Sequence, residues 1–270
     1  MNLPHFERAV TLFEAGEFEL ALEQFQQLAI TTSDSSHKAS LLVDQATCLT
    51  EMGRIADAKR CLAEAKRLTR DDPREAILIE LSHICLLLRE DDQPAALAQL
   101  GRLLEEYGDC LRTDDFHFLY QDIQMQRGFL LMQLDRYQEA LPILEEVRSF
   151  QSGGEICCHL GRCYHGLGRH LSAQQHLLLA AEAGVPEDWQ AAFHYYLGCS
   201  YHELGQFALA KQQFLFCIQA EAADAPAKVY QKLAAACSQL GGHEDAAHYT
   251  QLACATVSTQ RLAHAASSPY

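Results

Sequence analysis

Residues 160–168 read LGRCYHGLG, and residues 197–205 repeat that pattern as LGCSYHELG. In both stretches a glycine closes the segment, and an alanine follows five residues later. We name the closing residue the anchor. Anchor and alanine recur seven times: Gly16 and Ala21, Gly53 and Ala58, Asp91 and Ala96, Asp135 and Ala140, Gly168 and Ala173, Gly205 and Ala210, Gly241 and Ala246. Successive anchors are 37, 38, 44, 33, 37 and 36 residues apart. A period in this range predicts a chain built of stacked repeats.

The residues around each anchor follow the spacing of helices. In the fifth unit, Gly161 and Tyr164 stand seven and four residues before the anchor, and Leu177 and Ala180 stand nine and twelve after it. Steps of three and four residues place such side chains on one face of a helix. Each unit therefore predicts two helices joined by a tight turn at the anchor. We expect a glycine anchor to end the first helix in a left-handed conformation, and an aspartate anchor to cap the second helix.

This order of small, aromatic and bulky apolar residues around glycine and alanine resembles the tetratricopeptide repeat family. The resemblance covers about residues 4–253 and is weakest in the third unit, where Asp91 and Gln93 replace the usual glycine and aromatic residue. It implies an all-α fold, an α-solenoid forming a right-handed superhelix of about seven helix-turn-helix repeats. The expected repeats lie near residues 3–34, 35–70, 73–108, 114–150, 153–185, 187–222 and 225–253.

The step of 44 residues between the third and fourth anchors requires extra chain. The segment Glu105–Asp115 supplies it, with Gly108 and Asp109 as the expected turn, and we expect lengthened helices or a longer loop there. A hinge is predicted in this segment. Thr250, where the family has a bulky apolar residue, is typical of a terminal capping repeat. Residues 254–270 are expected to be a helix end followed by a mobile tail.

Composition limits the partners that the chain can have. The net charge of -15 argues against nucleic acid and anionic membranes as partners. It favours a basic or amphipathic polypeptide as the partner; the alternative is that the charge only keeps the protein in solution. No apolar run is long enough for a membrane span, and residues 1–10 lack the features of a secretory signal. We therefore expect a cytoplasmic protein with protein or peptide partners, no nucleic acid and no membrane insertion. Self-association stays open.

Eleven cysteines without a Cys-x-x-Cys pair predict reduced thiols that pack mostly in the core, among them Cys48 and Cys85. The sequence offers one loose cluster of metal-ligand types, which consists of His159, Cys163, His165, Cys199 and His202. Because Cys163 falls on a packing position, we expect no metal site, and no cofactor is predicted.

The family resemblance implies a concave groove lined by the first helices of the repeats. Carried over position by position, the expected groove consists of Phe13, Val43, Thr47, Leu81, Arg89, Met125, Phe129, Met132, His159, Arg162, His165, Tyr195, Tyr196, His202 and Lys232. Many of these side chains are apolar, and an exposed apolar strip often marks a binding site. The alternative is that neighbouring helices or a second copy of the chain cover them.

The sequence contains neither a phosphate-binding glycine loop nor a Gly-x-Ser-x-Gly motif, so we expect no enzyme. The leading hypothesis is a non-catalytic scaffold or adaptor that binds a peptide or helix of a partner protein in the groove. A cytosolic chaperone for a secretion or assembly client, and a self-assembling structural protein, are the alternatives.

Overall fold

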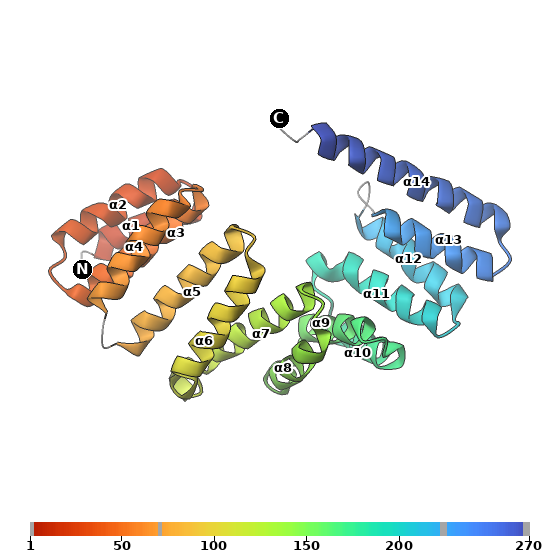
Figure 1. Cartoon of the computed structure of the whole chain (residues 1–270), viewed down its shortest axis with the longest axis horizontal. Helices are drawn as coiled ribbons and strands as arrows, with labels where there is room; N and C mark the ends of the chain where they lie inside the picture. Colours follow the sequence, from red (N-terminus) through yellow and green to blue (C-terminus); the bar gives the residue numbers. More distant parts are fainter. Residues whose placement is uncertain (1–2, 70–71, 222–225, 267–270) are drawn as a thin grey trace. The chain divides into compact units, whose positions relative to one another are not determined.

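The computed structural model describes residues 3–69, 72–221 and 226–266. Within these ranges the chain forms fourteen α-helices and no strand (Figure 1). The helices are α1 (Leu3–Glu14), α2 (Phe18–Thr31), α3 (Ser35–Glu51), α4 (Ile55–Leu68), α5 (Pro73–Arg89), α6 (Gln93–Leu111), α7 (His117–Gln133), α8 (Tyr137–Phe150), α9 (Gly154–Gly166), α10 (His170–Ala183), α11 (Gln190–Glu203), α12 (Phe207–Glu221), α13 (Ala227–Gln239) and α14 (His243–Ala266).

The helices divide into two compact units, Met1–Ile123 and Gln124–Tyr270, with the boundary inside α7. In unit 1, α1 packs on α2, α3 on α4, and α5 on α6. In unit 2, α9 packs on α10, α11 on α12, and α13 on α14. Consecutive hairpins also pack on each other, for example through α2 and α3 in unit 1 and through α10 and α11 in unit 2. The predicted all-α stack of helical hairpins is confirmed, whereas the hinge at residues 105–115 stays a prediction.

Every anchor lies in the left-handed region of the backbone. Gly16 has a φ of 79°, and the aspartate anchors Asp91 and Asp135 have φ values of 59° and 57°. The residue after the anchor donates its N–H to a carbonyl near the end of the first helix, as Arg136 does to Leu131 at 2.8 Å. This bond is typical of a helix that ends in a left-handed residue. The expectation that an aspartate anchor caps the second helix is therefore wrong. Instead, aspartate substitutes for glycine, because a short polar side chain tolerates this conformation.

Small residues of the first helices receive large residues of the second helices, as the spacing predicts. A Cβ atom added to Gly128 would lie 2.6 Å from Leu144, and one added to Gly198 would lie 2.7 Å from Phe214. Such separations are shorter than van der Waals contact, so only glycine allows these helices to approach so closely. Leu144 and Phe214 are fully buried as a result.

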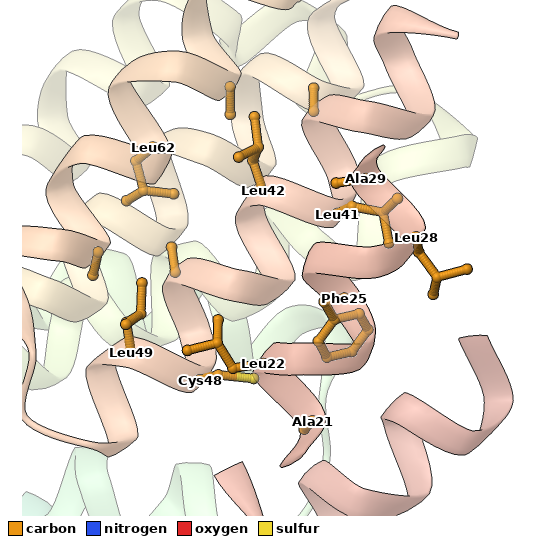
Figure 2. Packing of buried hydrophobic residues seen from close by; sticks show 14 of the residues in the cluster. Ala21, Leu22, Phe25, Leu28, Ala29, Leu41, Leu42, Cys48, Leu49 and Leu62 are labelled. Atoms are coloured by element: carbon orange, nitrogen blue, oxygen red, sulfur yellow. The ribbon is translucent and has the colours of Figure 1, made fainter. Parts of the chain in front are cut away.

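The core of unit 1 is made of the same repeat positions (Figure 2). The alanine, Ala21, and the bulky residues Phe25 and Leu28 on α2 are all buried in this core, and the ring of Phe25 lies 6.0 Å from that of Phe6 on α1. On α3, Leu41 is fully buried and the thiol of Cys48 packs among apolar side chains. Repeat-spaced apolar side chains thus hold α3 in place, and the side chains on its remaining face are left at the surface.

The long step between the third and fourth anchors is taken up by helix. The turn expected at Gly108 and Asp109 is wrong, because both residues lie inside α6, which continues to Leu111. Leu103 and Leu111 are buried on the same face, so packing favours continuation of the helix through Gly108. A short 3-10 helix at Asp114–Phe116 then leads into α7.

The last hairpin has the features of a terminal repeat. Thr250 is exposed, whereas the equivalent residues of earlier repeats, such as Leu177 and Phe214, are fully buried. The helix α14 runs on to Ala266, and the end of the expected tail, residues 267–270, lies outside the described residues. In the described part of the chain, no helix combines the length and the apolar character that a membrane span requires.

Candidate protein-binding surfaces

A cavity of about 290 Å³ lies between α3 and α5, the first helices of the second and third repeats. We name it the α3/α5 cavity. Its apolar wall includes Val43 from α3 and Leu78 and Leu81 from α5. Leu78 is 50% exposed, which is high for a leucine on a helix that packs on both sides. The sequence predicted Val43 and Leu81 as surface residues of one groove, and the structure brings them to the same cavity.

A smaller cavity of about 210 Å³ continues along the same two helices. Thr47 of α3 and Cys85 and Arg89 of α5 are among the residues that line it. The guanidinium of Arg89 donates to the carboxylate of Glu51 across the two helices. The predicted residues Thr47 and Arg89 therefore share a second recess, whose cation is already paired. Phe13 lies apart from both cavities, with its ring 5.3 Å from that of Phe18.

Asp44 is one of the polar residues of the α3/α5 cavity that sequence reasoning did not predict. It is half-buried, and burial alone raises the pKa of its carboxyl to about 6. No hydrogen bond or ion pair from the described residues reaches this carboxylate. The signal was present in the sequence, since Asp44 stands nine residues before its anchor, as do the predicted groove residues His159, Tyr196 and Lys232.

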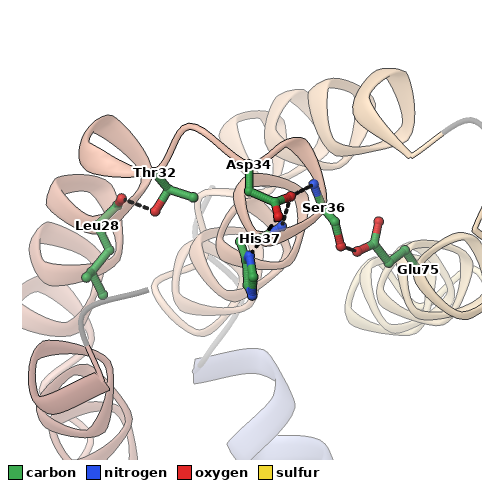
Figure 3. A network of polar contacts seen from close by, with 6 residues as sticks. All are labelled: Leu28, Thr32, Asp34, Ser36, His37 and Glu75. Carbon is green, nitrogen blue, oxygen red and sulfur yellow. Dashed lines mark hydrogen bonds and ion pairs between the residues drawn. The ribbon is translucent and has the colours of Figure 1, made fainter.

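Polar contacts join α3 to α5 at one end of the cavity (Figure 3). The Asp34 carboxylate caps α3 by accepting hydrogen bonds from the backbone N–H groups of Ser36 (2.8 Å) and His37 (3.4 Å). The Ser36 hydroxyl in turn donates to the carboxylate of Glu75, which also lines the cavity. The Glu75 carboxylate is therefore already engaged, in contrast to that of Asp44.

In unit 2 the predicted residues form two groups of contacting rings, one between α7 and α9 and the other between α9 and α11. The ring of Phe129 lies 5.7 Å from that of His159, and the ring of His165 lies 5.4 Å from that of Tyr196. Tyr196 also contacts Tyr195, at 5.2 Å between ring centroids. All five rings except that of His159 are half-buried.

Lys232 lies on α13, where its Nζ is 3.4 Å from the carboxylate of Glu203. His202, next to that carboxylate, packs its ring 5.3 Å from that of Phe207. Met125 and Arg162 are half-buried on α7 and α9. Parts of the Lys232, His202, Met125 and Arg162 side chains are therefore accessible at the surface of unit 2.

Two of the predicted groove residues are not at the surface. Met132 is fully buried, and His159 is 4% exposed. The ring of Trp189 lies 4.4 Å from that of His159, and burial, helped by the charge of Arg162, lowers the pKa of this histidine to about 4. Neighbouring side chains cover both positions, so neither offers an accessible surface to a partner. Trp189 was not linked to His159 in the sequence analysis because it stands 30 residues further along the chain.

All eleven cysteines are free thiols, and seven of them are buried, Cys48 among them. Cys85 departs from the expectation of a core position, since it is exposed on α5 and lines both cavities of unit 1. Burial raises the pKa of the Cys163 and Cys199 thiols to about 11, so both stay protonated at neutral pH. Among the described residues, no three histidine, cysteine or acidic side chains are grouped to hold a metal ion.

Comparison with known proteins bears on the fold. Residues 154–183, which span α9 and α10, match a family model described as a tetratricopeptide repeat. No curated protein matches the sequence.

Solved structures with similar folds include a signal transduction ATPase with numerous domains from Pyrococcus horikoshii, which has a tetratricopeptide repeat sensor. The identity is 16% and the TM-score is 0.77, over 92% of this chain and 40% of that one. A tetratricopeptide repeat protein from Parabacteroides merdae has 17% identity and a TM-score of 0.61, over 94% and 92% of the two chains. A chain of the APC/C hetero-tetramer Cut9–Hcn1 has 15% identity and a TM-score of 0.60, over 92% of this chain and 45% of that one.

The present chain spans less than half of the Pyrococcus horikoshii protein that it matches. At such low identities the similarity concerns the fold alone. Together with the match at α9 and α10 and the seven repeated hairpins, it shows that the chain has the fold of tetratricopeptide repeat proteins.

Proposed function

We propose that this protein is a non-catalytic scaffold that binds a peptide or helix of a partner protein in the α3/α5 cavity. The observation that carries the proposal is the apolar wall of this cavity. There Leu78 on α5 is half exposed, although α5 packs against α3. Recesses with apolar walls and a few polar groups are the usual form of binding sites, and helical peptides bind in apolar grooves through regularly spaced anchors.

The fold supports the same reading. One neighbour is part of a hetero-tetramer, and so assembles with another protein, and a second carries its repeats as a sensor. The half-buried rings of unit 2, such as Phe129 and Tyr195, are proposed as a further contact surface. A cytoplasmic location is part of the proposal and is supported by the eleven free thiols, since disulfides are rare in reducing compartments.

The test uses random linear peptides displayed on phage and selected on the immobilised full chain. Leu78→Gln makes the cavity wall polar without adding charge. Ile30→Gln is the matched control, because Ile30 is 78% exposed on α2 and lies outside the cavity. We expect selected peptides to bind the Leu78→Gln variant at least about tenfold more weakly, and the Ile30→Gln variant as well as the wild type. Equal binding to all three proteins would contradict the proposal.

A further inference from the structure

The residues that line the α3/α5 cavity include two carboxylates and no cation. The carboxylates are those of Asp44 and Glu75, and the rest of the lining is apolar apart from Ser40 and Ser82. Glu75 already accepts a hydrogen bond from Ser36. Asp44 therefore presents the unsatisfied charge of this cavity.

A carboxylate in such a position is costly to the free protein. Taking a charge out of water destabilises the folded state unless a partner compensates for it. For Asp44 no compensating group comes from the described residues, and the effect of burial is visible in its raised pKa. A cation supplied from outside would compensate for the buried charge. The lost stability and the missing partner thus point to the same kind of ligand.

The shape of the wall restricts that ligand further. Val43 is the residue before Asp44, and Leu78 and Leu81 face the cavity from α5. A lysine or arginine side chain buries its methylene stem along apolar surface while its charged end reaches a polar group. A small cation would leave these apolar side chains uncovered, whereas a basic residue with apolar neighbours would cover them.

Building on the proposed function, we infer that the occupant of the α3/α5 cavity is a polypeptide segment that inserts a lysine or arginine side chain to pair with Asp44. Apolar residues beside that basic residue pack against Val43, Leu78 and Leu81. The proposal gives the negative charge of the cavity a specific role in recognition, beyond the general acidity of the chain.

The experiment determines the sequences of the phage-displayed peptides selected on the wild-type chain and measures their affinities for variants. Asp44→Asn keeps the shape of the side chain and removes its charge. Glu23→Gln is the matched control, because Glu23 is exposed on α2 and lies outside the cavity. We expect the peptides to contain a lysine or arginine among apolar residues. We also expect Asp44→Asn to weaken binding by about 30-fold or more, and Glu23→Gln to change it by less than about twofold.

The outcomes separate this inference from the proposed function. Peptides without a basic residue, or peptides that bind Asp44→Asn as tightly as the wild type but lose affinity for Leu78→Gln, would overturn the inference and leave the proposed function in place. Peptides that bind Leu78→Gln and Asp44→Asn as tightly as the wild type would overturn both. Replacement of the peptide's basic residue by norleucine should reproduce the loss seen with Asp44→Asn, and should cost nothing further on that variant.

Discussion

Gly161 on α9 and Leu177 on α10 approach so closely that a Cβ atom on residue 161 would lie 2.5 Å from the Leu177 Cγ. Both residues are buried, and they occupy the small and large positions of the fifth repeat. This contact is the clearest instance of the packing on which the whole stack depends.

Substitution of Gly161 by alanine should therefore destabilise the protein. The added methyl group overlaps Leu177, and the cost of overpacking exceeds the gain in helix propensity, so we expect a net loss of about 1–2 kcal/mol in the free energy of unfolding. Gly101→Ala is the control, because Gly101 lies in α6 with open space around it, and it should stabilise by about 0.5–1 kcal/mol. Urea denaturation measures both. Equal effects of the two substitutions would contradict the packing described here.

The neighbours Asp91 and Asp92 should respond in opposite directions to substitution. Asp91 is held at a φ of 59°, where glycine is favoured, so Asp91→Gly should stabilise by about 1 kcal/mol. Asp92 caps α6 by accepting a hydrogen bond from the backbone N–H of Ala95 at 3.1 Å, so Asp92→Ala should destabilise by about 1 kcal/mol. Thermal unfolding of both variants tests the assignment. A stabilising Asp92→Ala would contradict the assignment of Asp92 as the cap.

These examples show what the sequence could and could not predict. The repeat spacing predicted the hairpins and the small-to-large contacts because packing repeats with the chain. The role of the aspartate anchors was mistaken because aspartate suits both a cap and a left-handed residue, and only the backbone angles distinguish the two. The turn at Gly108 was mistaken because buried leucines on the same helix outweigh one glycine.

The candidate surface was predicted in part for a similar reason. Family positions identified Val43, Leu81, Tyr195 and Tyr196, which are half-buried or line a cavity. They could not show that other helices cover Met132 and His159. Asp44 was missed because the position nine residues before the anchor was considered only in the last three repeats.

The raised pKa of Asp44 predicts a dependence of stability on pH. The ordinary value is 3.8 and the folded value is about 6, so between these values the folded chain binds more protons at Asp44 than the unfolded chain does. The contribution of this group to stability therefore falls as pH rises through that window, and the full penalty is present above about pH 6. The titratable groups nearby are Cys48 on α3 and Glu75 and Cys85 on α5. Burial and the charge of Asp44 raise the pKa of the Cys48 thiol to about 11.

Asp44→Asn should accordingly stabilise the free protein above about pH 6, by no more than about 3 kcal/mol, and the difference should shrink toward pH 3.8. Denaturation of wild type and variant across this range measures the effect, with Glu23→Gln as a control for the loss of one charge. A difference that does not change with pH would mean that burial does not penalise this carboxylate.

His159 should behave in the opposite way, because burial lowers its pKa from 6.5 to about 4. The imidazole stays neutral in the folded chain while the unfolded chain gains a proton, so its contribution to stability is present above pH 6.5 and falls as pH drops toward 4. Arg162 adds to this lowering, and Glu155 lies 3.8 Å from the ring nitrogen.

The single tryptophan, Trp189, reports on this histidine directly. A protonated imidazole quenches a neighbouring indole, so the fluorescence of Trp189 should stay constant down to about pH 5 and fall near pH 4. The His159→Gln variant should lack this fall. Quenching near pH 6.5 in the wild type would show that His159 is open to solvent.

The central claim is that a polypeptide occupies the α3/α5 cavity, and site-specific photocrosslinking in the source cells tests it most directly. Benzoyl-phenylalanine replaces Leu78 in the cavity wall in one variant and the exposed Ile30 of α2 in the other. We predict a covalent adduct with a discrete polypeptide at position 78 and none at position 30. No adduct at position 78, or the same adducts at both positions, would contradict the account.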